Sequence, residues 1–190
     1  MPLALRQVVA AAAFAATCAA VFVSPAAAQQ RAGVMGELIK DMHDVHGKLV
    51  ALAKAMPANT YGWRPEAGVR SVSEVFLHVA SDNYLLPSAV GVAPDPSTGI
   101  KTDDMKTLGV FEKQSLNNEA MAAALDKSFG HLAKAMNESP DSKLDDKVKF
   151  FGQDFTTRQL WILTVTHLHE HLGQAIAYAR SNHVKPPWSK

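Results

Sequence analysis

Residues 156–180, TTRQLWILTVTHLHEHLGQAIAYAR, decide the fold that the sequence predicts. The stretch opens with Thr156 and, three residues later, Gln159, which is the pattern of a capping box at a helix N-terminus. Apolar residues then recur at the spacing of one helical face. These positions are Leu160, Leu163, Leu168, Leu172 and Ile176. We therefore predict a helix that ends near Arg180, before Asn182 and the two prolines that follow it.

Three earlier segments repeat the helical spacing of apolar residues. They cover residues 34–56, which stop at a proline, residues 71–86, which open with a second capping box, and residues 115–136. Residues 87–107 are rich in proline and glycine and predict a long surface connection, and residues 148–151 predict a short extended piece. Four long helices without sustained strand alternation favour an all-α fold, a four-helix bundle.

The N-terminus has the order of a secretory signal peptide. Arg6 precedes an apolar, alanine-rich run, and small residues follow Pro25, so we expect cleavage after Ala28. The run is too short and too weakly apolar for a membrane span, so no stable membrane insertion is expected after its removal. The sequence therefore predicts an exported protein, periplasmic or secreted, with residues 1–28 as the signal and residues 29–190 as one domain.

Composition restricts the chemistry of the mature chain. Removal of residues 1–28 takes away Arg6 and the only cysteine, so 18 basic residues then balance 18 acidic ones. A chain with this balance offers no electrostatic attraction for nucleic acid. Without cysteine it has neither disulfides nor thiolate ligands, and its stability must come from an apolar core.

Histidines are the most informative residues. His167 and His171 are four residues apart, so a helix places both imidazoles on one face and turns His169 to the other side. On a strand all three would share a face, but the capping box and the length of the pattern favour the helix. We predict that His167 and His171 bind the same ion.

A metal ion with an open coordination position still needs a third protein ligand. His78 is the best candidate because it lies within an apolar segment, and the alternative is a core histidine bonded to a carbonyl group. His43 and His46 are weaker candidates on the first helix. Asp82 shares the face of His78 and could accept a hydrogen bond from a ligand or bind the ion itself, and the alternative is an ordinary exposed acid on the helix.

Other catalytic motifs are absent from the sequence. The residue after His167 is Leu168, whereas a zincin metalloprotease needs glutamate there. The chain has no nucleophile elbow, no phosphate-binding P-loop and no dinucleotide fingerprint. No catalytic residue is therefore assigned from motifs.

Three stretches resemble the DinB-like family of four-helix metal-binding proteins. They are MPANTYGWRPEAGVRSVSEVFLHVASDNYLL at residues 56–86, HLHEHLGQ at 167–174 and AIAYARSNHVKPPWS at 175–189. The resemblance implies one ligand from the second helix and two from the last, which correspond to His78, His167 and His171. It also implies an up-down-down-up bundle and a homodimer.

The resemblance extends to function. Relatives include metal-dependent thiol transferases and isomerases, so the ion could activate a thiol, or equally water for hydrolysis of a small-molecule substrate. A non-catalytic metal-binding or interaction protein of the cell envelope is the alternative. Three imidazoles suit zinc or nickel, with iron and copper as further possibilities.

Overall fold

The computed structural model describes residues 32–190, and the predicted signal peptide lies outside them. The described chain is mostly helical, with five α-helices and one small antiparallel sheet. Short 3-10 turns occupy Ala58–Thr60, Leu86–Val90, Pro96–Thr98 and Asp141–Lys143. The helices are α1 (Val34–Ala55), α2 (Val72–Leu85), α3 (Lys106–Glu112), α4 (Asn118–Asn137) and α5 (Thr157–Ser181), and the strands are β1 (Lys147–Phe150) and β2 (Gln153–Thr156).

Local sequence explains where the two site-bearing helices begin. At the start of α2 the Ser71 hydroxyl accepts from the Glu74 amide, and the Glu74 carboxylate accepts from the Ser71 amide. Thr156 and Gln159 form the same reciprocal pair at the start of α5. Each pair satisfies two donors that a helix N-terminus leaves without a partner, so both predicted capping boxes are confirmed.

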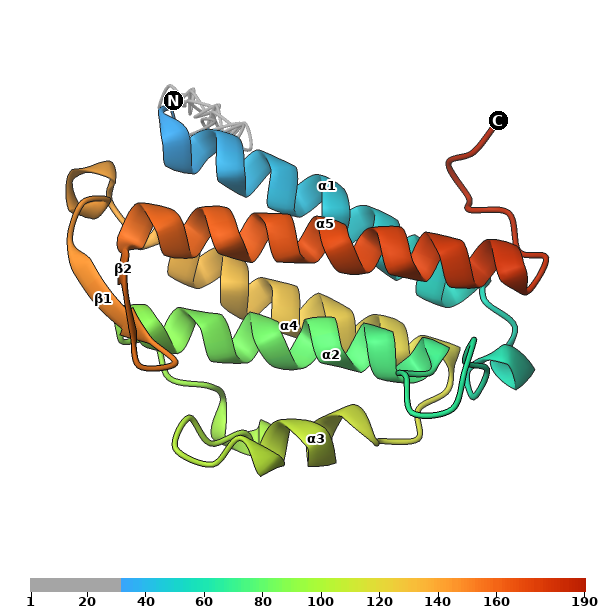
Figure 1. Cartoon of the computed structure of the whole chain (residues 1–190). Helices are drawn as coiled ribbons and strands as arrows, with labels where there is room; N and C mark the ends of the chain where they lie inside the picture. Colours follow the sequence, from blue (N-terminus) through green and yellow to red (C-terminus); the bar gives the residue numbers. More distant parts are fainter. Residues whose placement is uncertain (1–31) are drawn as a thin grey trace, which may run out of the picture. The chain divides into compact units, whose positions relative to one another are not determined.

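The four long helices pack against one another around one apolar core. Helix α1 contacts α4 and α5, and α2 contacts the same two helices. In Figure 1, α2 and α4 run in one direction and α1 and α5 in the other. The largest side chains buried between them are Trp161, Phe76 and Phe129. The indole N–H of Trp161 donates to the Ser139 hydroxyl over 2.9 Å, so burial leaves this donor satisfied.

Three expectations need correction or refinement. The predicted long connection contains α3, which docks on α2 through Leu108 and Phe111. The all-α expectation holds only in the coarser form of a mostly helical fold, because the predicted extended piece pairs with β2 across a two-residue turn. Leu163, which the helical spacing assigns to the apolar face of the last helix, is 37% exposed. Helical spacing alone cannot tell a core from a cavity wall, because both are lined by apolar side chains.

No helix among residues 32–190 combines the length and the hydropathy that crossing a bilayer requires.

Candidate metal centre

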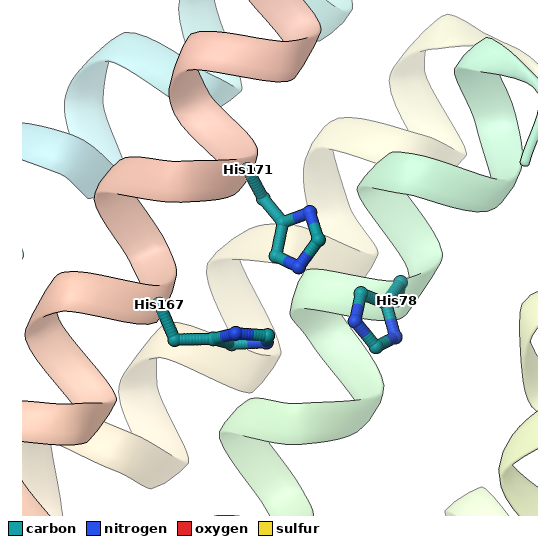
Figure 2. Close-up of side chains that lie close together, drawn as sticks. All are labelled: His78, His167 and His171. Atoms are coloured by element: carbon teal, nitrogen blue, oxygen red, sulfur yellow. The ribbon is translucent and has the colours of Figure 1, made fainter.

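Three histidines from two helices meet in one place. His78 projects from α2, while His167 and His171 project from successive turns of α5, and the rings point toward one another between the helices (Figure 2). Their ring centroids are 4.4 to 5.3 Å apart. One nitrogen from each ring lies within 4.8 Å of the other two. The structure therefore brings together the three residues that the sequence singles out.

The other histidines lie elsewhere. His169 is exposed and pairs with Asp41 on α1 at 3.0 Å, as expected for the opposite side of α5. His46 stacks on Phe129 and pairs with Asp126 of α4. His43 and His183 are exposed, and His131 packs against Tyr84. None of these five belongs to the cluster.

Hydrogen bonds fix the protonation of the His171 ring. The Tyr178 hydroxyl donates to the carbonyl of Arg70 and accepts from the amide NH₂ of Gln174. The remaining amide oxygen of Gln174 lies 2.9 Å from Nδ1 of His171, so this nitrogen carries the proton. Nε2 then presents a lone pair. Burial lowers the pKa of His171, with further lowering by His167 and His78, so the ring is neutral at pH 7.

A second chain of contacts orients His78. Its Nδ1 lies 2.8 Å from a carboxylate oxygen of Glu112, the last residue of α3. Arg70 donates to both oxygens of the same carboxylate, at 2.8 and 3.3 Å. Burial would raise the pKa of Glu112, but the hydrogen bonds from His78 and Arg70 outweigh it and lower that pKa. The ionised carboxylate therefore accepts a proton from Nδ1 of His78, so Nε2 is the nitrogen that can bind a metal ion.

Asp82 faces one nitrogen of His167 and one nitrogen of His78. Its Oδ2 lies 2.7 Å from Nε2 of His167 and 3.3 Å from Nε2 of His78. A protonated His167 nitrogen can donate to this carboxylate. The two nitrogens of His78 thus each face a carboxylate, Glu112 at Nδ1 and Asp82 at Nε2. A metal ion bound at Nε2 would take the place of a proton there and would be attracted by the carboxylate of Asp82.

The donor set fits a divalent metal ion. Metal-binding histidines commonly donate their second ring nitrogen to a carboxylate or amide, as His78 and His171 do here. Nitrogens that bind one tetrahedral zinc ion at 2.0–2.1 Å are about 3.3 Å apart, so modest side-chain rotation would complete the site. Two carboxylates, Asp82 and Glu112, accompany only one guanidinium, and the resulting negative charge also favours a cation.

A cavity of about 560 Å³ opens beside the histidines. His78, His167, Asp82, Glu112 and Arg70 contribute polar groups to its wall. Apolar side chains from α2, α3, the hairpin and α5 line much of the rest. They include Leu85, Leu108, Phe150, Phe151, Phe155 and Leu163. The site is thus open to a small molecule on the side of His78 and His167, whereas His171 is buried.

Sequence reasoning missed the residues that support the ligands. Gln174 is three residues after His171 on the same helix, and this spacing was a usable signal. Glu112 is separated from His78 by 34 positions, and Arg70 lies in a loop. No local pattern connects either of them with His78.

Comparisons with known proteins give one family match and several matches of fold. The family model described as the DinB superfamily matches residues 41–175. No curated protein sequence gives a significant match. A crystal structure of a DinB-like protein from Bacillus cereus aligns with a TM-score of 0.66 and 14% identity, covering 83% of this chain and 97% of that one.

Two further crystal structures share the fold. A DinB-like protein from Bacillus subtilis aligns with a TM-score of 0.59 and 17% identity, covering 80% of this chain and 96% of that one. A mycothiol-dependent maleylpyruvate isomerase aligns with a TM-score of 0.57 and 13% identity, covering 73% of this chain and 59% of the isomerase.

Proposed function

The chain belongs to the DinB superfamily, and on that premise we propose that it is an exported protein that binds one divalent ion. The proposed ligands are His78, His167 and His171. We further propose that the protein acts as a hydrolase or thiol transferase on a small molecule. The observation that carries this proposal is the meeting of three imidazoles beside a cavity. Their framework is proposed to be an up-down-down-up four-helix bundle, to which α3 and the hairpin are additions.

A bound divalent ion would supply Lewis acidity, which lowers the pKa of a coordinated water or thiol. We assign acceptance of the released proton to Asp82, an assignment supported by its carboxylate bordering both His78 and the cavity. A nucleophile activated in this way would form a bond to an electrophilic atom of the substrate while the bond to the leaving group breaks. Asp82 would then return the proton to the leaving group. Glu112 keeps His78 oriented throughout.

A thiol remains among the candidate nucleophiles because one protein of the same fold is a mycothiol-dependent isomerase. Water is the other candidate, since low-molecular-weight thiols are mostly cytosolic and this chain is proposed to be exported. Zinc or nickel suits three neutral imidazoles, with iron and copper as alternatives. We also propose a homodimer, which light scattering of the purified mature chain would test.

Metal binding is tested by elemental analysis of the mature protein purified without an affinity tag. About one ion per chain is expected. His171→Ala, like His78→Ala and His167→Ala, should abolish tight binding. His169→Ala is the matched control, because it removes an imidazole from the same helix outside the cluster, and it should retain the ion. Equal loss in all four variants, or no ion in the wild type, would contradict the proposal.

The second candidate is a non-catalytic metal-binding protein of the cell envelope. It is favoured by the short distances from Asp82 to His167 and His78, since a fourth protein ligand would close the site. The cobalt(II)-substituted protein separates the two candidates. An open position binds added azide and changes the visible spectrum, as the enzyme predicts, whereas a closed site leaves the spectrum unchanged.

A further inference from the structure

The tip of the β1–β2 hairpin has an unusual backbone. Phe150 pairs with Gln153, so Phe151 and Gly152 form a two-residue turn. Both have positive φ, 48° for Phe151 and 75° for Gly152. Turns of this kind favour asparagine, aspartate or glycine at the first position, because a bulky side chain is strained in the left-handed region. Phenylalanine is therefore a poor local choice at residue 151.

Burial does not account for this choice. The Phe151 side chain is 64% exposed, and its ring contacts Phe150 with a centroid distance of 4.2 Å. It does, however, line the cavity beside the histidines. Bulky residues held in sparsely populated backbone regions cluster at functional sites. The position of the ring on the cavity wall is the feature that gives the strained residue a use.

Two more large apolar side chains on the same wall are also partly exposed. Met105, just before α3, is 40% exposed, and Leu163 of α5 is 37% exposed. They come from elements far apart in the sequence, yet both line one cavity with Phe151. Exposed apolar side chains gathered around one cavity indicate a ligand with apolar surface.

The polar side chains of the cavity wall lie together at the candidate metal centre. His78 contacts Glu112, which contacts Arg70, and Asp82 contacts His78 and His167. These five form one connected cluster at the candidate metal centre. A ligand that fills the cavity would therefore meet polar groups mainly at the ion and apolar groups over much of its remaining surface.

We propose that this cavity binds a small molecule with one metal-coordinating head group and an apolar chain or ring as its body, and that Phe151 packs on that body and sets the preference for it. This inference rests on the proposed metal site. The volume of about 560 Å³ is within the range of small-molecule pockets, about 300–1,000 Å³. The residue at position 151 is thus selected for the ligand rather than for the turn.

Straight-chain hydroxamic acids test the proposal, because all share one metal-binding head group and differ only in apolar length. Isothermal titration calorimetry of the zinc-loaded mature protein should show affinity rising from acetohydroxamate to octanohydroxamate. The expected gain is about fourfold for each methylene group that becomes buried. Equal affinity along the series would overturn the inference.

Phe151→Asn separates a ligand-binding role from a structural one. Asparagine suits the left-handed turn, so the thermal unfolding midpoint should stay the same or rise. Affinity for acetohydroxamate should be unchanged, while the gain for the longer chains should shrink severalfold. Val110→Asn is the control, since Val110 is 73% exposed on α3 and does not line the cavity. A full chain-length gain in Phe151→Asn, or a lower midpoint with loss of every ligand, would contradict the assignment.

Alcohols from 1-butanol to 1-octanol distinguish failure of this inference from failure of the metal site. They carry the same chains without the chelating head, and their binding to the folded protein is detected as a rise in the thermal unfolding midpoint. A rise that grows with chain length, in a protein that binds neither zinc nor acetohydroxamate, would support the apolar cavity and reject the metal site. If acetohydroxamate binds but chain length affects neither the affinity of the hydroxamic acids nor the midpoint with the alcohols, the apolar cavity alone would be rejected.

Discussion

The carboxylate of Glu112 lies 2.8 Å from Nδ1 of His78, although Glu112 ends a seven-residue helix that provides no candidate ligand. The short helix α3 therefore takes part in the candidate metal centre through one hydrogen bond. Because Nδ1 of His78 is engaged by Glu112, Nε2 is the nitrogen that would bind an ion.

Glu112→Gln should weaken metal affinity by about 10–100-fold, because the neutral amide polarises His78 less and no longer pairs with Arg70 as an ion. Competition with a chromophoric chelator measures the change. Glu66→Gln is the control, since Glu66 is an exposed acid in the loop before α2, and its affinity should equal that of the wild type. Equal affinities in all three proteins would show that Glu112 does not support the ligand.

His131→Phe should reduce the loss of stability in mild acid. Burial lowers the pKa of His131, and its Nε2 has no hydrogen-bond partner among residues 32–190. Below a pH of about 6.5, His131 binds a proton in the unfolded chain but not in the folded chain. The free energy of unfolding therefore falls as the pH falls toward the pKa of His131 in the folded chain.

Thermal unfolding midpoints at pH 8 and pH 5 measure this effect. The difference between the two midpoints should be smaller in His131→Phe than in the wild type. Tyr84→Phe alters the packed neighbour without removing the imidazole, so it should keep the wild-type difference. A wild-type difference in His131→Phe as well would assign the acid sensitivity to other groups.

Thr156→Ala should lower the free energy of unfolding by about 1 kcal/mol, because it removes the side-chain acceptor at the start of α5. Chemical denaturation measures the change. Thr166→Ala makes the same substitution at an exposed position inside α5. It should be neutral or slightly stabilising, since alanine is the better helix former. Equal destabilisation by Thr156→Ala and Thr166→Ala would show that the hydrogen bond of the cap does not stabilise the helix.

Two tryptophans provide a matched test of the core. Trp161 is fully buried, whereas Trp188 is 38% exposed. Trp161→Ala should lower the free energy of unfolding by about 3–5 kcal/mol through the cavity it leaves. Trp188→Ala should change it by less than about 1 kcal/mol. Denaturant titration measures both variants. Similar losses of unfolding free energy would show that Trp161 is no more important to the core than Trp188.

Export predicts a defined N-terminus. If residues 1–28 are a signal peptide, the protein recovered from its native compartment should begin at Gln29. Intact-mass measurement reads this directly. A chain that keeps residues 1–28 in the cytoplasm would contradict the prediction and remove the main argument against a cytosolic thiol as co-substrate.

The long helices and two of the histidines could be predicted because their signals are local. Apolar spacing and a capping box mark α5, and the interval between His167 and His171 sets a common face for any helix. For His78, the residues alone left a core histidine and a ligand equally open. Only the packing of α2 against α5 places its ring beside the other two.

The missed features are short or depend on distant residues. Helix α3 has two buried apolar residues, Leu108 and Phe111, which is too few to establish a period. The hairpin turn lacks the asparagine–glycine pair that identifies such turns, because Phe151 occupies the first position. The cavity depends on how α3, the hairpin and α5 meet, and no single segment encodes that arrangement.

Arg70 joins the supports of two candidate ligands. Its guanidinium holds Glu112 beside His78, and its carbonyl accepts from Tyr178, which steadies Gln174 beside His171. The loop that carries Arg70, α3 and the end of α5 should therefore open together in hydrogen exchange. Metal should then slow amide exchange in all three segments at once, and its release would be a local unfolding event rather than the departure of one ligand at a time.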